Sequence, residues 1–205
     1  MIPWLPGLDN LPQEDLHALE TAAISANLDP IDLALHISQE STFVASARNG
    51  SQSGLIQMSP ATSRVFNGSS NAGGLSFQAQ LPGIIRYFSI GRPISGADFR
   101  LLGIRRGEAG KARLIDVSDQ YVIFPKGSKG WTANPSIRGP KNGDITAGSV
   151  RKEWTRFREA YLDKPQPTPW ADRQWLAYRL RKASPLAVPV LGGLSFGLVW
   201  LARKN

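Results

Sequence analysis

The stretch LDPIDLALHISQESTFVASARNGSQSGLIQMSPAT (residues 28–62) sets a short apolar helix before a lone carboxylate and a loop of small polar residues. Asp29 is a good N-cap and Pro30 a good first helical residue, so a helix should begin there. The helix should bury one face, because apolar or small residues recur at helical spacing. That face is predicted to contain Ile31, Ala34, Leu35 and Ser38. Glu40 then falls at the C-terminal end of the helix, with no basic residue beside it in the sequence.

The surrounding sequence predicts a mainly α fold for residues 1–162. Apolar spacing and capping residues indicate further helices at residues 12–26, 60–66, 77–90 and 150–162. Residues 44–53 and 67–74 are rich in small polar residues and are expected to be loops. Between residues 91 and 149, many Gly and Pro residues leave one short β-like run, QYVIFPKGSKGW (120–131).

The composition limits the chemistry that is available. The 205 residues contain no cysteine, which excludes disulfides, thiolate catalysis and cysteine-ligated metal. His17 and His36 are too few and too far apart to suggest a metal site, and both are expected at helix surfaces or edges. No metal and no cofactor are therefore predicted. The N-terminal residues lack the basic and apolar regions of a secretory signal.

The positive charge belongs mainly to the C-terminal tail. Seven basic residues and one acidic residue follow Asp163, so the tail carries +6 of the net charge of +8. A nearly neutral main domain argues against specific nucleic-acid binding, which needs concentrated charge on a folded face. Residues 163–182 read as a linker and a basic amphipathic helix, and 183–205 as an apolar anchor or assembly segment.

The apolar segment leaves two interpretations open. Residues 183–202 carry no charge, and as a helix they would extend about 30 Å, which matches a bilayer core. Alternatively, they are buried against other subunits of an assembly. We therefore expect residues 170–205 to contact a bacterial membrane or virion structural proteins.

Glu40 is the candidate catalytic residue. Cleaving a glycosidic bond requires an acid that holds its proton near neutral pH, usually through burial away from water. Ile37 and Phe43 are apolar neighbours that would shield this carboxyl. A glutamate at a helix end is more often a solvated surface residue, so its position alone does not mark Glu40 as catalytic.

The motif pattern around Glu40 resembles the soluble lytic transglycosylase family, which has a lysozyme-like fold. That family carries Glu-Ser-x-Phe, an Ala, a Ser/Gly-rich loop, Gly-Leu-Met-Gln and Pro-x-Thr in this order. The corresponding residues here are Glu40-Ser41-Thr42-Phe43, Ala47, Gly54-Leu55-Ile56-Gln57 and Pro60-Ala61-Thr62. Residues 119–150 are similar to the downstream part of phage-encoded members, and the two resemblances together span residues 15–155.

The resemblance implies a fold, an activity and a place of action. Glu40 would protonate the oxygen between N-acetylmuramic acid and N-acetylglucosamine, and then take the proton of the muramoyl 6-hydroxyl. That hydroxyl attacks its own anomeric carbon, so the product is a 1,6-anhydro sugar and no second carboxylate is needed. The expected partner is the peptidoglycan strand, and the expected location is a virion that acts at the periplasm and cell envelope.

The resemblance also indicates substrate-binding candidates. Gln57 would contact a sugar through its amide, or else stabilise the loop. Ser41 would orient Glu40 or simply end the helix, and Gly54 would let the backbone approach the substrate or merely turn. Phe43 and Met58 are expected in the core. The family's third motif, Ala-Tyr-Asn, is not recognisable, and the substitutes for its tyrosine are Tyr121, Tyr87 and Trp131.

The segment around Gly143 is similar to a calcium loop that has lost its ligands. With Ile145 at the eighth loop position, Arg138 and Pro140 stand where oxygen ligands are needed. Neither side chain supplies an oxygen, so we expect a turn without metal.

Two other functions remain open from the sequence. The domain could be a structural virion or tail component of little or no activity. It could also be a hydrolysing lysozyme with a second acid. The candidates for that acid are Asp98, Glu108, Asp116, Asp119 and Asp144.

Overall fold

The helix predicted after Asp29 is present and lies in the middle of the fold. The computed structural model describes residues 2, 4–90, 93, 96–105, 115–139 and 142–162, and in it α2 spans Pro30–Ser41. The Asp29 side chain accepts hydrogen bonds from the backbone N–H groups of Ile31 (2.8 Å) and Asp32 (3.2 Å). Residues 32–38 are all buried, so α2 is covered on nearly every side.

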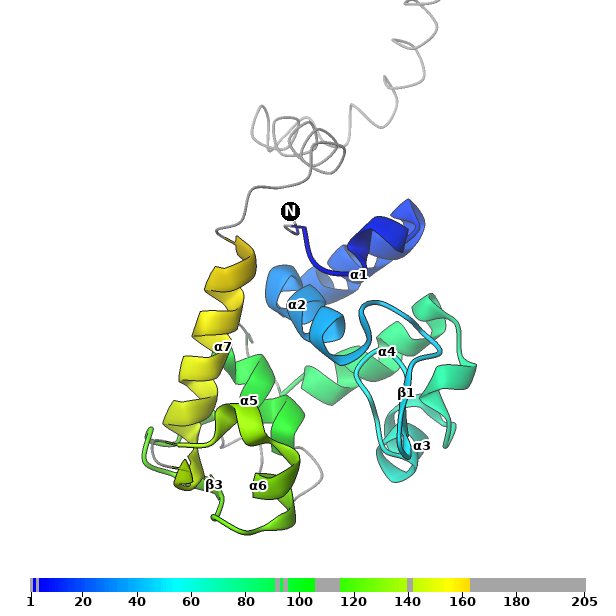
Figure 1. Cartoon of the computed structure of the whole chain (residues 1–205). Helices are drawn as coiled ribbons and strands as arrows, with labels where there is room; N and C mark the ends of the chain where they lie inside the picture. The colour runs from blue at the N-terminus through cyan, green and yellow to red at the C-terminus, as the bar shows by residue number, and fades with distance from the viewer. Residues whose placement is uncertain are drawn as a thin grey trace, which may run out of the picture. The chain divides into compact units, whose positions relative to one another are not determined.

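Three other predicted helices form a group on one side of α2 (Figure 1). They are α1 (Gln13–Ser25), α3 (Pro60–Asn67) and α4 (Phe77–Phe88). Both α1 and α3 pack against α4, and α1 also contacts α2. Part of the predicted 44–53 loop is a hairpin of β1 (Arg48–Asn49) and β2 (Gln52–Ser53).

The second group of elements lies on the other side of α2 (Figure 1) and was only partly predicted. It contains α5 (Ala97–Arg105), β3 (Val122–Phe124), α6 (Lys129–Ala133), β4 (Ile145–Thr146) and α7 (Ala147–Leu162). The β-like run and the last helix are confirmed, and β3 pairs antiparallel with β4. The sequence reading missed α5 and α6. Short 3₁₀ turns occur at Leu8–Asn10, Ala72–Gly74 and Pro135–Ile137.

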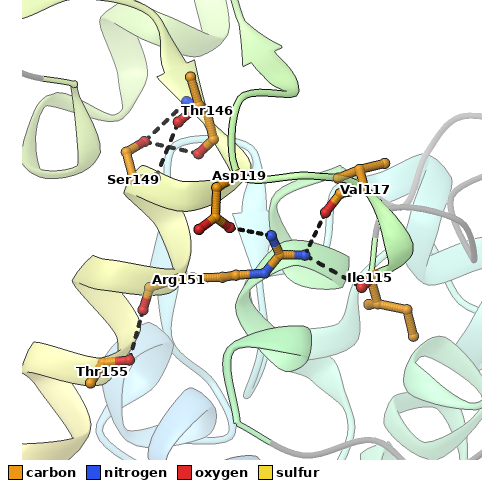
Figure 2. Close-up of polar contacts among 7 residues, drawn as sticks. All are labelled: Ile115, Val117, Asp119, Thr146, Ser149, Arg151 and Thr155. Atoms are coloured by element: carbon orange, nitrogen blue, oxygen red, sulfur yellow. Dashed lines mark hydrogen bonds and ion pairs between the residues drawn. The ribbon is translucent and has the colours of Figure 1, made fainter.

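The N-terminus of α7 is fastened to the preceding chain by a local polar network (Figure 2). Ser149 Oγ accepts from the Thr146 N–H (3.0 Å), and Thr146 Oγ1 accepts from the Ser149 N–H (3.2 Å), which caps the helix. Arg151 pairs with Asp119 at 2.6 Å and donates to the Val117 carbonyl at 3.0 Å. The first turns of α7 also contribute to a small apolar core. It consists of Leu101, Ile123, Ile137, Ile145, Ala147 and Val150.

The fold is therefore mainly helical, as predicted. Ile2–Pro165 forms one compact unit. No helix among the described residues is long and apolar enough to cross a membrane. The predictions for residues 163–182 and 183–205 fall outside the described residues.

Candidate functional site

Glu40 lies on the wall of a cavity of about 380 Å³. The cavity is bounded by α2, the β1–β2 hairpin, the Gly-Leu-Ile-Gln loop, α4, α5 and the end of α6. Glu40 and Gln57 line it together, although 17 positions separate them in the sequence. Residues from the two motifs of the resemblance thus share one cavity in this chain.

The chain is held in an uncommon conformation on both sides of this cavity. Thr42 (φ 49°) and Phe43 (φ 63°), directly after α2, and Gln57 (φ 48°) are non-glycine residues in the left-handed region. Such conformations cost free energy and persist only where the surroundings impose them. Gly7 (φ 87°) lies so close to the Thr42 carbonyl that a Cβ would approach its oxygen to 2.1 Å. The N-terminal segment therefore braces the corner that follows Glu40.

Gln57 is a lining residue of the cavity whose amide is held in place by the backbone. Its Nε2 donates to the carbonyl oxygens of Gly54 (2.8 Å) and Ala47 (3.3 Å), which fixes the orientation of the amide. Its Oε1 is buried and has no hydrogen-bond partner among the described residues. A buried acceptor without a partner is costly, so the fold holds this amide at some expense of stability.

The group that contacts the Glu40 carboxylate is Arg100 of α5. Arg100 Nη1 lies 2.8 Å from Glu40 Oε1, and Arg100 Nε lies 3.8 Å from Glu153 Oε2 on α7. The side chains of Arg100, Glu40 and Glu153 are 15%, 26% and 11% exposed, so the pairs are largely screened from water. The sequence reading missed both Arg100 and Glu153. No local signal marks them, because their roles come from the packing of α5 and α7 against α2.

His36 lies one turn before Glu40 on α2 and is buried, which corrects the expectation of a helix surface or edge. Its ring packs edge-on against Phe88 (5.2 Å between centroids) and beside Trp154 (6.2 Å). Burial, and secondarily the charge of Arg100, lowers the pKa of His36 to about 3. The ring is therefore neutral at physiological pH. Its Nδ1 has no hydrogen-bond partner in the described part of the chain.

One further turn back on α2, Asp32 is fully buried. It accepts from the Gly96 N–H (2.5 Å) and from Trp154 Nε1 (3.4 Å), and it pairs with Arg158 Nε (3.1 Å). Burial raises the pKa of the Asp32 carboxyl, and the neighbouring donors partly offset that effect. Asp32, His36 and Glu40 thus form one polar line on α2, at intervals of four residues.

Three predicted substrate-binding residues do not line the cavity. Ser41 is buried and donates to the Ile37 carbonyl (3.1 Å), which is a helix-end contact. Gly54 (φ 87°) packs so tightly that a Cβ would lie 2.5 Å from Gln80 Oε1. Tyr121 is 42% exposed, and its carbonyl accepts from the N–H of Ala147 at the start of α7. Phe43 and Met58 are buried, as expected.

Tyr87 and Trp131, the other candidates for the role of the family's tyrosine, donate hydrogen bonds to backbone carbonyls. Tyr87 lines the cavity, but its hydroxyl donates toward the carbonyls of Gly103 (3.2 Å) and Leu102 (3.4 Å). Trp131 donates from Nε1 to the Gly143 carbonyl (2.9 Å). Among the described residues, the side chain that forms an ion pair with Glu40 is that of Arg100.

None of the described candidates for a second acid lines the cavity. Asp119 pairs with Arg151, and Asp144 accepts from the Lys126 N–H (2.7 Å). Asp98 and Asp116 lie elsewhere, and Glu108 falls outside the described residues. Glu153 is connected to this site, because it pairs with Arg100, which also pairs with Glu40.

Contacts of the calcium-loop-like segment are described for Gly139, Gly143 and Asp144. Gly139 and Gly143 form an antiparallel bridge, and the Gly139 N–H donates to the Asp144 carbonyl (3.2 Å). Within the described ranges, no group of three or more His, Asp or Glu side chains is placed to hold a metal ion.

Comparisons with protein-family models, curated proteins and solved structures found no match for this chain. The resemblance described above rests on its motif residues.

Proposed function

We propose that this protein is a lytic transglycosylase with a lysozyme-like domain, which cleaves the bond between N-acetylmuramic acid and N-acetylglucosamine in peptidoglycan. The observation that carries the proposal is the shared cavity of Glu40 and Gln57, built from the two motifs of the resemblance. In this mechanism Glu40 gives its proton to the glycosidic oxygen as the bond to the anomeric carbon breaks. It then accepts the proton of the muramoyl 6-hydroxyl, whose oxygen forms the new bond to that carbon.

Arg100 has a specific place in this mechanism. The contact at 2.8 Å is that of a guanidinium with an ionised carboxylate, whereas the first step needs a proton on Glu40. The entering sugar must therefore loosen this ion pair, and Glu153 keeps the arginine charge partly compensated when it does. After the proton is transferred, Arg100 stabilises the carboxylate that remains, which is electrostatic stabilisation of a developing charge.

Gln57 supports the same proposal as a substrate-positioning group. Gln57 lines the cavity of Glu40, and the two backbone hydrogen bonds of its Nε2 fix the side chain, so it would form a rigid wall against which the sugar is held. Correct placement matters because the nucleophile belongs to the substrate, and an intramolecular attack depends on the geometry in which the ring is held.

The test is digestion of purified peptidoglycan, with mass spectrometry of the released fragments. Wild-type protein should release 1,6-anhydro products, and Glu40→Gln should lower turnover by roughly 10²- to 10⁴-fold, the usual contribution of a general acid. Glu14→Gln, at an exposed position on α1, is the matched control and should digest like the wild type. Equal turnover by wild type and Glu40→Gln would reject Glu40 as the catalyst.

One observation favours hydrolysis as a second candidate. Glu153 provides a second carboxylate that shares Arg100 with Glu40. In that mechanism Glu153 would activate a water molecule, and the products would carry reducing ends. Glu153→Gln would then abolish turnover, whereas in a transglycosylase it removes only the partial compensation of the Arg100 charge and should lower turnover far less than Glu40→Gln does.

The proposal extends to a role as a phage virion component that opens the cell wall during genome delivery. Its support is the concentration of positive charge after Asp163 beside an uncharged apolar segment, which suits an envelope membrane or a virion assembly. Particles should contain the protein. Its presence only in host cytosol would contradict this role.

A further inference from the structure

A second cavity, of about 800 Å³, lies beside α7 and next to the cavity of Glu40. We call it the α7 cavity, and it is lined by residues of 136–139 and by the face of α7 that carries Lys152, Arg156 and Glu159. Two features connect the cavities. Glu153 lines the α7 cavity and pairs with Arg100, which lines the Glu40 cavity. Residues 133–134 of the Glu40 cavity are also separated from Ser136 of the α7 cavity by one residue of the chain.

Three cations face the α7 cavity. The Arg138 guanidinium lies 3.7 Å from the centroid of the Trp131 ring and donates toward the Trp131 carbonyl (3.4 Å), so its position is restrained. Lys152 and Arg156 are exposed and one helical turn apart on α7. The side chain of neither residue has a hydrogen bond or ion pair with any residue that the structure describes. Arg151 of the same helix is bound to Asp119, by contrast.

Two carboxylates, those of Glu153 and Glu159, also line the α7 cavity. Glu153 is committed to Arg100, and its Oε2 is buried. Glu159 is exposed, one turn beyond Arg156. The cavity therefore offers three cations and one available carboxylate, together with the hydroxyls of Ser136 and Thr155. This combination suits a ligand with several carboxylates and an amine, because each charged group of such a ligand meets an opposite charge.

We propose that the α7 cavity binds the peptide of the peptidoglycan strand: a short peptide with two or more carboxylates and a free amine, joined to the sugar that occupies the Glu40 cavity. This inference rests on the proposed function, because it takes the glycan to lie over Glu40. The carboxylates meet Arg138, Lys152 and Arg156, and the amine meets Glu159. The protein then selects strands that still carry their peptides.

The test measures binding by the full-length Glu40→Gln variant, in which turnover should be roughly 10²- to 10⁴-fold lower, so that the probe stays intact during the measurement. The probes are a disaccharide fragment of peptidoglycan with its peptide and the same fragment after an amidase has removed the peptide. The peptide-bearing fragment should bind roughly 3- to 30-fold more tightly, as two or three exposed ionic contacts allow. Adding Lys152→Ala and Arg156→Ala should abolish this preference and leave the affinity for the bare fragment unchanged.

Two controls separate this role from general effects of charge. Arg64→Ala, at an exposed position on α3, removes a cation away from both cavities and should keep the preference. The exchange Lys152→Arg with Arg156→Lys retains both charges and should keep it as well. The preference should shrink in about 0.5 M salt, because exposed charges are then screened.

Equal affinity for the two fragments, including no measurable binding of either, overturns the inference. So does a preference that survives the double substitution, or tighter binding of inorganic phosphate or of a DNA oligonucleotide than of the released peptide. Digestion of peptidoglycan by the wild type tests the proposed function separately. A protein that prefers the peptide-bearing fragment but releases no products would keep this inference and lose the enzymatic proposal.

Discussion

Lowering the pH from 7.5 to 5 should reduce the free energy of unfolding through one residue, His36. Its ring is enclosed by Phe88, Trp154 and the backbone of Gly103, and a Cβ at Gly103 would lie 2.7 Å from its Cε1. Burial, followed by the nearby charge of Arg100, lowers the pKa of His36 to about 3, against 6.5 for a free histidine. The unfolded chain therefore binds a proton in a pH range where the folded protein does not.

The sign and the size follow from this difference. The stability contributed by the neutral ring is present in full above about pH 6.5, and it is lost as the pH falls from there toward 3. At pH 5 the unfolded state gains about 2 kcal/mol from protonating this histidine, while the folded state gains almost nothing. For a domain of this size that corresponds to a fall in Tm of roughly 4–8 °C.

The assay is urea unfolding at pH 7.5 and pH 5, followed by tryptophan fluorescence. His36→Leu replaces the ring with an apolar side chain of similar volume and should remove about 2 kcal/mol of the pH dependence. His36→Gln is the second variant, which guards against a failure of the leucine to fold. His17→Gln is the matched control, since His17 is the only other histidine and is exposed on α1.

The comparison between variants is needed because Asp32 acts in the opposite direction. Burial raises the pKa of its carboxyl above 3.8, so its contribution to stability increases as the pH falls through the folded value. This effect is common to the wild type and the His36 variants. If His36→Leu changes the free energy of unfolding by the same amount at both pH values, the buried ring does not resist protonation and the reasoning is wrong.

Three further perturbations test the local architecture. Gly54→Ala should cost about 2 kcal/mol or more in urea unfolding, because φ is 87° and the new Cβ would meet Gln80 Oε1; wild-type stability would contradict the tight packing. Arg151→Ala should cost about 1 kcal/mol and speed amide hydrogen exchange in residues 115–121, through loss of the Asp119 pair and the carbonyl contacts in Figure 2. Unchanged exchange there would show that the core alone holds the segment. Asp29→Ala should lower Tm through loss of the α2 cap, worth about 1 kcal/mol, whereas Asp29→Ser should restore most of it.

Patterns among residues close together in the sequence predicted most of the helices. The start of α2 followed from Asp29 and Pro30, since a capping side chain and a fixed φ act within three residues of one another. Glu40 at the end of that helix and Gln57 in the following loop were likewise identified from motifs close in the chain. These features depend on short-range geometry, which neighbouring residues largely determine.

The contacts that decide the chemistry of the cavity were not predictable in this way. Arg100 stands in a short helix after a Gly- and Pro-rich stretch, and it meets Glu40 across 60 positions of sequence. The burial of His36 arises because α2 is covered by helices on its remaining sides, although one apolar face was all that its periodicity indicated. No propensity or spacing rule encodes which helices meet, because that depends on how whole apolar faces pack together. The residues of the site could thus be proposed from the chain itself, but the partner of the carboxylate and the protonation state of the neighbouring ring were decided only when α5 and α7 packed against α2.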